Sequence, residues 1–192
     1  MSLPKKNIAI FASGSGTNAE AIARYFTNNN EVSVSIILSN NPNAYVLQRV
    51  ENFGISTFVF NREQLYNEKT VFLKLIDGSI DFIVLAGFMW LIPDNILKSF
   101  KNKIINIHPA LLPNYGGKGM YGHHVHEAVS RAGDTETGIT IHFVNQEYDR
   151  GEIIFQVKCK IEPHENPNKI AEKIHLLEHE YYPKVIEQTL KI

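Results

Sequence analysis

A carboxamide and an imidazole stand two residues apart in the segment Asn106-Ile-His108. The segment ends a short apolar run, and side chains two apart on a strand point to the same face. Asparagine can donate a hydrogen bond to an anionic oxygen, and histidine can donate or accept a proton near neutral pH. The pair is therefore a candidate for stabilising a tetrahedral oxyanion and moving its proton. A histidine that only bonds a backbone carbonyl at the end of the sheet is an alternative of equal weight.

A carboxylate that could serve this histidine is Asp149, in the loop 145–151 after a segment that contains His142. A carboxylate beside His108 would orient the ring and favour its charged form. Aspartate before Arg-Gly is also a common turn residue, so the sequence leaves both roles open. His142 alternates with Thr140, and we expect it to face the same cleft.

The segment Gly14-Ser-Gly-Thr-Asn-Ala19 fits the pattern G-x-G-x-x-A between a strand and a helix. Backbone N–H groups and the helix dipole at such a turn favour an anion, usually phosphate. A dinucleotide site would also need an acidic residue at the end of the second strand, which reads Leu38-Ser-Asn-Asn41 instead. We therefore predict a phosphate monoester site and no NAD. A turn that only packs the helix on the strand is the alternative.

The other histidines do not predict a metal site. His123 and His126 can share a helix face, but His124 cannot easily join them. His175 and His179 are spaced i, i+4 but lack the glutamate of the H-E-x-x-H motif. We predict that no metal is bound and that the 123–126 cluster lies near an anionic pocket or on the surface.

The elements that must position these groups alternate between strand and helix patterns. We expect strands at 7–12, 32–38, 56–60, 81–86 and 103–108, with helices at 19–26, 44–53, 61–77 and 93–100. Thr17 or Asn18 should cap the first helix, and Leu65, Phe72 and Ile76 should face inward. Strands without polar alternation predict a mostly parallel sheet with helices on both faces, as in Rossmann-like α/β folds.

The second half of the chain reads differently. A helix is expected at 122–132, followed by strands at 138–144 and 152–158 that predict a mixed or antiparallel extension of the sheet. The last helix should begin near Asn166, and Pro183 should kink or restart it. We expect a single domain over 1–192, with a Rossmann-like phosphate-binding half (1–105) and a catalytic half (106–192).

Composition excludes several classes of protein. Nineteen basic and twenty acidic residues argue against a large basic face for nucleic acid. The single cysteine, Cys159, cannot form an internal disulfide or a zinc-type pair. No apolar run approaches the roughly 20 residues that span a bilayer, and no secretory signal is visible. These observations predict a cytoplasmic protein with no membrane or nucleic-acid partner.

Five segments in one order along the whole chain carry a family resemblance. They are Gly14–Asn18, Val84–Met89, Asn106–Pro113, Gly138–Val144 with Asp149–Gly151, and Glu178–Pro183. Together they resemble the formyltransferase superfamily and, within it, the phosphoribosylglycinamide formyltransferase family. The resemblance implies transfer of the formyl group of 10-formyltetrahydrofolate to the amine of 5-phosphoribosylglycinamide, in purine biosynthesis. It also implies the formyltransferase fold and small-molecule partners, and we expect a monomer or weak homodimer.

The resemblance assigns roles by motif position. Asn106 would donate to the oxyanion, His108 would donate a proton, and Asp149 would raise the basicity of His108. The phosphorylated substrate would be held by Gly16, Thr17, Asn18 and Glu178. The folate would be held by Arg62, Met89, Trp90, Leu91, Ile92, Asn106, Asn145 and Asp149, and the half 106–192 would be folate-binding as well as catalytic.

Two features depart from the family pattern, and other functions remain open. Trp90 stands where relatives often have arginine, and the loop 114–122, with four glycines and a lysine, suggests a mobile lid. A formyltetrahydrofolate deformylase would use the same three catalytic groups but resembles this chain only after an additional N-terminal domain. Transfer to methionyl-tRNA would need a further C-terminal domain. A non-catalytic nucleotide- or phosphate-binding module is the alternative from another class.

Overall fold

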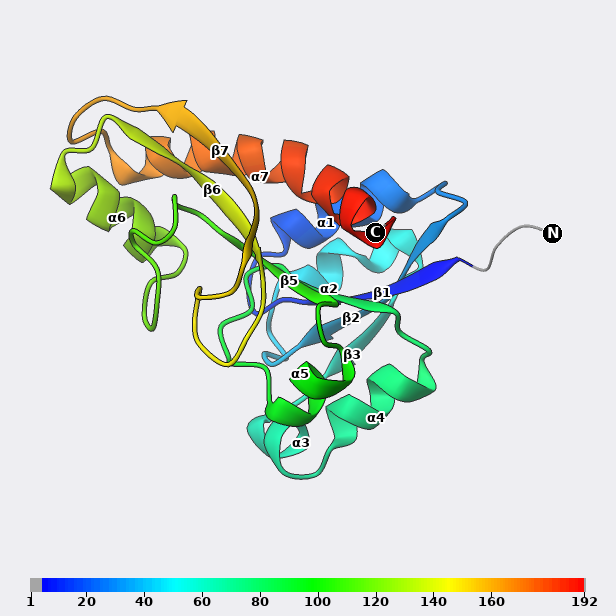
Figure 1. Ribbon diagram of the computed structural model, residues 1–192. Coiled ribbons are helices and arrows are strands. Elements are labelled where there is room, and N and C mark those ends of the chain that lie inside the picture. Colours follow the sequence, from blue (N-terminus) through cyan, green and yellow to red (C-terminus); the bar gives the residue numbers. More distant parts are fainter. Residues whose placement is uncertain (1–4, 192) are drawn as a thin grey trace.

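A seven-stranded sheet forms the centre of the computed structural model, which describes residues 5–191 (Figure 1). Its order is β3-β2-β1-β4-β5-β6-β7. The strands are β1 (Lys6–Phe11), β2 (Val32–Ser39), β3 (Ser56–Val59), β4 (Phe82–Leu85), β5 (Ile104–His108), β6 (Glu136–Phe143) and β7 (Ile153–Lys160). The first five run parallel, and β6 and β7 are antiparallel to their neighbours. The predicted parallel sheet with an antiparallel extension is therefore confirmed.

Helices cover both faces of the sheet. They are α1 (Thr17–Phe26), α2 (Val46–Arg49), α3 (Arg62–Tyr66), α4 (Thr70–Asp77), α5 (Asp94–Ser99), α6 (His123–Ala132) and α7 (Pro167–Leu190). Helices α1, α2, α6 and α7 pack on one face and α3, α4 and α5 on the other (Figure 1). All four residues of β4 are buried, as expected for a strand covered on both faces. No helix within residues 5–191 is both long and apolar enough to cross a membrane.

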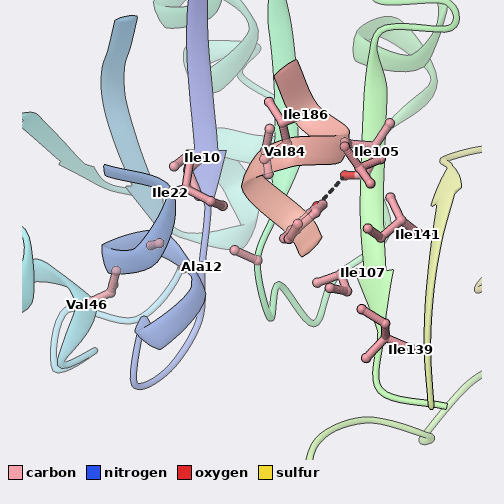
Figure 2. Close-up of a cluster of buried hydrophobic side chains, with 14 of the residues drawn as sticks. Ile10, Ala12, Ile22, Val46, Val84, Ile105, Ile107, Ile139, Ile141 and Ile186 are labelled. Atoms are coloured by element: carbon pink, nitrogen blue, oxygen red, sulfur yellow. Dashed lines mark hydrogen bonds between the residues drawn. The ribbon is translucent and has the colours of Figure 1, made fainter. Parts of the chain in front are cut away.

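The larger of two hydrophobic cores lies beneath α1 and α7 (Figure 2). Side chains of the central strands, such as Ile10 and Val84, meet Ile22 of α1 and Ile186 of α7 there. Tyr182 of α7 is fully buried. Its hydroxyl lies 2.9 Å from the Leu85 carbonyl oxygen and 3.3 Å from that of Ile105. The last helix is thus fixed to β4 and β5 by packing and by a polar anchor.

The start of α1 differs from the sequence prediction. Gly16 occupies the cap position in a left-handed conformation, with φ 76° and ψ 23°, and no side chain caps the helix. Thr17 and Asn18 are already helical, so the prediction that one of them caps α1 is wrong. A Cβ at position 16 would lie 2.7 Å from Val46 Cα. Only glycine combines this backbone conformation with so close an approach of α2.

The segment predicted as one helix over 61–77 is two. Asn61 caps α3 through a capping box with Gln64. The chain then turns through Lys69, at φ 59°, before α4 begins. The second helix starts with a new phase, so the buried residues of α4 are Val71 and Leu75. The prediction that Ile76 points inward is wrong, because its side chain is 48% exposed; Leu65 is buried and Phe72 is partly buried, as predicted.

The helices predicted at 44–53 and near the C-terminus differ from the structure in smaller ways. The segment 44–53 forms only α2 and a 3-10 turn at Glu51–Phe53, which ends at Gly54 with φ 64°. The last helix begins after Asn166, whose side chain caps it. It continues through Pro183 without a restart. Pro183 and the neighbouring Tyr182 are buried against the sheet, and this packing compensates for the missing N–H.

Candidate active site

One cavity of about 540 Å³ opens along the carboxyl ends of the parallel strands. Its lining comes from residues 14–18, 85–92, 106–109 and 117–122, with single residues between 126 and 178. This edge of an open α/β sheet is where such folds bind ligands. Both halves of the chain line the cavity, so the glycine loop and the Asn-x-His strand end face one space.

Asp149 lies at the centre of the polar groups in this cavity. Its Oδ2 accepts the Gly117 N–H at 2.9 Å and lies 3.5 Å from His108 Nδ1. Its Oδ1 lies 3.4 Å from Asn106 Nδ2. The residue has a left-handed φ of 55°, a conformation that aspartate tolerates better than most residues. The structure thus brings Asn106, His108 and Asp149 together, as the sequence predicted.

The His108 ring is held on both sides. Its Nε2 lies 2.8 Å from the Tyr115 carbonyl oxygen. A carbonyl oxygen only accepts, so Nε2 carries the hydrogen and Nδ1 is the atom that gains or loses a proton. That atom faces Asp149. The sequence left open whether His108 bonds a backbone carbonyl or faces a cleft, and the ring does both, because it bonds the Tyr115 carbonyl and lines the cavity.

Burial sets the ionisation of this pair. The His108 side chain is buried, which lowers its pKa and outweighs the opposing effects of Asp149 and the Tyr115 carbonyl. The net direction is opposite to the expectation that Asp149 keeps the ring charged. Burial alone would raise the pKa of Asp149, but the neighbouring His142 and His108 side chains and the Gly117 N–H together lower it. At neutral pH the centre therefore contains a neutral imidazole beside a carboxylate.

His142 completes the centre. Its Nδ1 donates to the Phe143 carbonyl oxygen at 2.8 Å, so its Nε2 accepts from Asn106 Nδ2 at 3.2 Å. The sequence placed His142 at the cleft through its alternation with Thr140 but missed this bond. The pairing of β5 with β6 sets Asn106 directly opposite His142. Both amide hydrogens of Asn106 therefore have acceptors, His142 and Asp149.

The glycine loop lies at the end of the cavity next to α7. Asn18 Nδ2 donates to Glu178 Oε2 at 3.0 Å, and His175 Nδ1 lies 2.9 Å from the same oxygen. This hydrogen bond raises the pKa of His175 above its usual value. Asn18 Oδ1 is buried without a partner among the described residues. The structure thus joins the predicted loop to Glu178, and His175 is a member of the site that the sequence analysis did not assign.

The histidines of α6 do not form a metal centre. His126 is buried and lines the cavity, and burial lowers its pKa to about 4. His123 and His124 are exposed and lie near Glu127. Residues 5–191 contain no group of three side chains that could hold a metal ion. His126 is thus the one of these three that faces the predicted anionic pocket.

Met89, Trp90, Leu91 and Ile92 give the cavity a largely apolar stretch of wall, which begins beside the glycine loop because the Met89 N–H donates to Ser13 Oγ at 3.2 Å. Trp90 packs edge-on against Phe60 and Phe88, with ring centroids 6.2 and 6.3 Å apart. Arg62 is absent from the lining but places its guanidinium 4.7 Å from the centre of the Trp90 ring.

Asn145 is also absent from the lining. Its side chain accepts the Glu147 N–H at 2.9 Å, which closes a turn. The same loop sends Tyr148 and Asp149 into the cavity. Folate binding by Asn145 and Arg62 therefore stays a prediction.

The glycine-rich loop 114–122 forms one wall of the cavity. It contacts the catalytic groups through the Tyr115 carbonyl and the Gly117 N–H. The start of the loop is held in place by the Tyr115 hydroxyl, which donates a hydrogen bond to Asp134 Oδ2 at 2.6 Å. Burial together with this bond raises the pKa of Tyr115 to about 12. The predicted lid is thus connected to the reaction centre, and its motion stays a prediction.

Comparison with known proteins gives a consistent result. Residues 6–186 match the family model described as "Formyl transferase". The phosphoribosylglycinamide formyltransferase of Bacillus subtilis is 38% identical over 190 residues, which are 96% of this chain and 95% of that protein. The enzyme of that name from Haemophilus influenzae is 34% identical, with 95% and 86% covered.

Solved structures agree. Phosphoribosylglycinamide formyltransferase from Bacillus halodurans superposes with a TM-score of 0.85 at 36% identity, covering 96% of this chain and 95% of that one. Glycinamide ribonucleotide transformylase 1 from Geobacillus kaustophilus gives a TM-score of 0.87 at 36% identity, with 97% and 100% covered. The predicted fold is confirmed by these structures.

Proposed function

The chain belongs to the formyl transferase family, and from this we propose that it is a phosphoribosylglycinamide formyltransferase. It transfers the formyl group of 10-formyltetrahydrofolate to the amine of 5-phosphoribosylglycinamide, a step of purine biosynthesis. The observation that carries the proposal is that Asn106, His108 and Asp149 meet in one cavity that the glycine loop and the Met89–Ile92 segment also line. A two-substrate transfer needs reacting groups at such a junction.

The phosphate of the acceptor is assigned to Gly16, Thr17 and Asn18. The first N–H groups of a helix lack intrahelical partners and attract an anion. Glu178 offers an acceptor for hydroxyl or amide hydrogens of the same substrate. The net charge of −1 suits an anion held by local dipoles rather than by a basic surface.

The folate is assigned to the slot formed by Met89, Trp90, Leu91 and Ile92. This lining fits a folate, because an apolar wall that also offers backbone polar groups suits a flat heterocycle. Arg62 and Asn145 flank this slot in our proposal, and Asn106 and Asp149 close it. When bound, the folate supplies the formyl carbon that the amine attacks.

The catalytic groups have distinct tasks. The Asn106–Asp149 bond, at 3.4 Å, is the longer of the two that Asn106 makes, so this amide hydrogen can turn to the formyl oxygen as negative charge develops there. His108 Nδ1 accepts the proton that the attacking amine loses and delivers a proton to the leaving nitrogen. Asp149 stabilises the charged ring between these steps. One N–C bond forms, one C–N bond breaks, and the protons balance.

The test is a transfer assay with and without the amine. We expect formylated product and tetrahydrofolate to appear together, and only when phosphoribosylglycinamide is present. Release of formate without the amine would instead identify a deformylase. Binding of phosphate with no turnover would identify a phosphate-binding module. The comparisons favour neither alternative.

The remaining expectations belong to the same proposal. We propose that the protein works in the cytoplasm on small molecules, as a monomer or weak homodimer, because one chain supplies every group assigned above. Within a single domain, 1–105 would supply most of the phosphate site and 106–192 the catalytic groups. The Met89–Ile92 wall comes from the first half, so folate binding draws on both. Sedimentation over a concentration series tests the oligomeric state.

A further inference from the structure

We infer that Arg49, which lies outside the cavity, is a positioning residue that holds the glycine loop in its phosphate-binding shape. The inference rests on the proposed function, since it concerns the phosphate-bearing substrate. Residues 14–18 line the cavity, whereas α2, which carries Arg49, contributes nothing to the lining. Any effect of Arg49 on the substrate therefore passes through the loop.

Three successive carbonyl groups of the loop have donors on its outer side. The Gly14 oxygen accepts the Val46 N–H at 3.1 Å, and the Gly16 oxygen accepts the Glu20 N–H at 2.9 Å. The Ser15 oxygen between them accepts Arg49 Nε at 2.8 Å. A carbonyl that turned into the cavity would repel a phosphate and remove a donor. Arg49 supplies the only side chain among these three bonds.

Arg49 is itself held in place. Its Nη1 donates to Glu20 Oε2 at 2.6 Å, and its guanidinium lies 4.9 Å from the centre of the Tyr45 ring. Glu20 stands in the first turn of α1. The guanidinium thus joins the loop to the helix whose N-terminus completes the phosphate site. Its planar fork can bond Ser15 and Glu20 at once, which an ammonium group cannot do in the same geometry.

The close packing of α2 on the loop supports this role independently. Val46 is fully buried and occupies the space that a side chain at Gly16 would need. Val46 and Arg49 lie one turn apart on the same short helix. One fixes Gly16 by contact and the other fixes Ser15 by a charged hydrogen bond. Together they stabilise the left-handed conformation of Gly16.

The chain offers a matched control in Arg24. Its guanidinium bonds the other oxygen of Glu20 at 3.1 Å, but its side chain is 72% exposed and it has no hydrogen bond to the glycine loop. Arg24→Met and Arg49→Met remove the same charge near the same carboxylate. Only the second removes the bond to Ser15.

The experiment measures phosphate affinity and steady-state kinetics of both variants. For Arg49→Met we expect the KM for phosphoribosylglycinamide and the Kd of inorganic phosphate, measured by calorimetry, each to rise roughly tenfold. The kcat and the KM for the formyl donor should stay within about twofold. Arg24→Met should change none of these. Arg49→Lys should recover part of the affinity, because lysine can donate to Ser15 but cannot also bridge to Glu20.

Each other outcome overturns the inference. Unchanged phosphate affinity in Arg49→Met, or an equal loss in Arg24→Met, would show that loop position does not depend on this bond. A wild-type protein that binds no phosphate would also overturn the inference, because the loop would then have no phosphate-binding shape for Arg49 to hold. If Arg49→Met fails to fold, Arg49→Lys carries the comparison. Phosphate binding needs no turnover, so a protein that binds phosphate without transferring formyl would refute the proposed function and leave the Arg49 result standing.

Discussion

The two polar regions of the cavity are built in opposite ways. The glycine loop is made of five consecutive residues, to whose main chain we assign the phosphate, and α2, which does not line the cavity, donates a backbone hydrogen bond to it. The reaction centre combines Asn106 and His108 of β5 with His142 of β6 and with Asp149, which stands 43 residues after Asn106. A local pattern builds the first, and the register of the sheet builds the second. The first should therefore be sensitive to backbone changes and the second to side-chain chemistry.

The largest effect should come from the reaction centre. We expect His108→Ala and Asp149→Ala each to lower kcat by roughly 10²–10⁴-fold, since each removes a group that moves or stabilises a proton. The KM for phosphoribosylglycinamide should change far less, because the glycine loop is untouched. The two values of kcat and KM from steady-state kinetics check this. A large KM effect with normal kcat would mean that the two regions are not separate.

The glycine loop should respond to a single added carbon. Gly16→Ala meets Val46 and strains a backbone at φ 76°, so we expect a loss of about 1–3 kcal/mol in the free energy of unfolding and a rise in the KM for the phosphorylated substrate. Gly14→Ala is the control, because a Cβ there meets nothing within 4 Å. Urea unfolding and kinetics on both variants test the prediction. Equal effects at the two positions would contradict the supporting role of α2.

The pH dependence of kcat/KM should belong to the reaction centre alone. Burial lowers the pKa of His108, so the neutral base persists below pH 6.5 and the rate should fall only at lower pH, about tenfold per pH unit. Asp149 opposes that shift, so Asp149→Asn should move the acidic limb to still lower pH. Profiles of both proteins show the direction. Arg49→Met is expected to keep the wild-type limb.

The smallest effect should lie at the apolar end of the cavity. Arg62→Met removes a cation–π contact with Trp90 that is worth about 0.5–1 kcal/mol at an exposed site. We expect the KM for the formyl donor to rise roughly two- to fivefold, with kcat unchanged. Lys74→Met, which removes a similar contact with Phe58 away from the cavity, serves as the control. No change in KM would show that Arg62 takes no part in folate binding.

The glycine loop and the reaction centre also differ in how much of each could be predicted from the sequence. The glycine loop between β1 and α1 was predictable because its pattern is contiguous, and its assignment to a phosphate rests on main-chain chemistry that this pattern implies. The bond between Asn106 and His142 was not, because it depends on how β5 and β6 pair, and a slip of one residue would separate them. The cap of α1 was missed because the preference of Thr17 and Asn18 for capping positions was overridden by the contact between Gly16 and Val46.

The reaction centre was predictable by identity but not by ionisation. Residue types and motif order pointed to His108 and Asp149, and the structure places them 3.5 Å apart. The net fall in the pKa of His108 comes from burial by segments far apart in the chain, including the loop that carries Tyr115. The break between α3 and α4 was missed for a related reason, since a residue with positive φ at Lys69 leaves no clear mark in the hydrophobic pattern.

The contact between Asn18 and Glu178 links parts of the chain that are 160 residues apart. A ligand that occupies this junction holds the first helix and the last one together, so unfolding of α7 as far as Glu178 must release it. By mass action, a ligand present at a hundred times its Kd raises the free energy of unfolding by about 2.7 kcal/mol. The persistence of the C-terminal helix in exchange or proteolysis experiments should thus rise with the concentration of the phosphorylated substrate. The last helix becomes a reporter of occupancy at a loop near the other end of the protein.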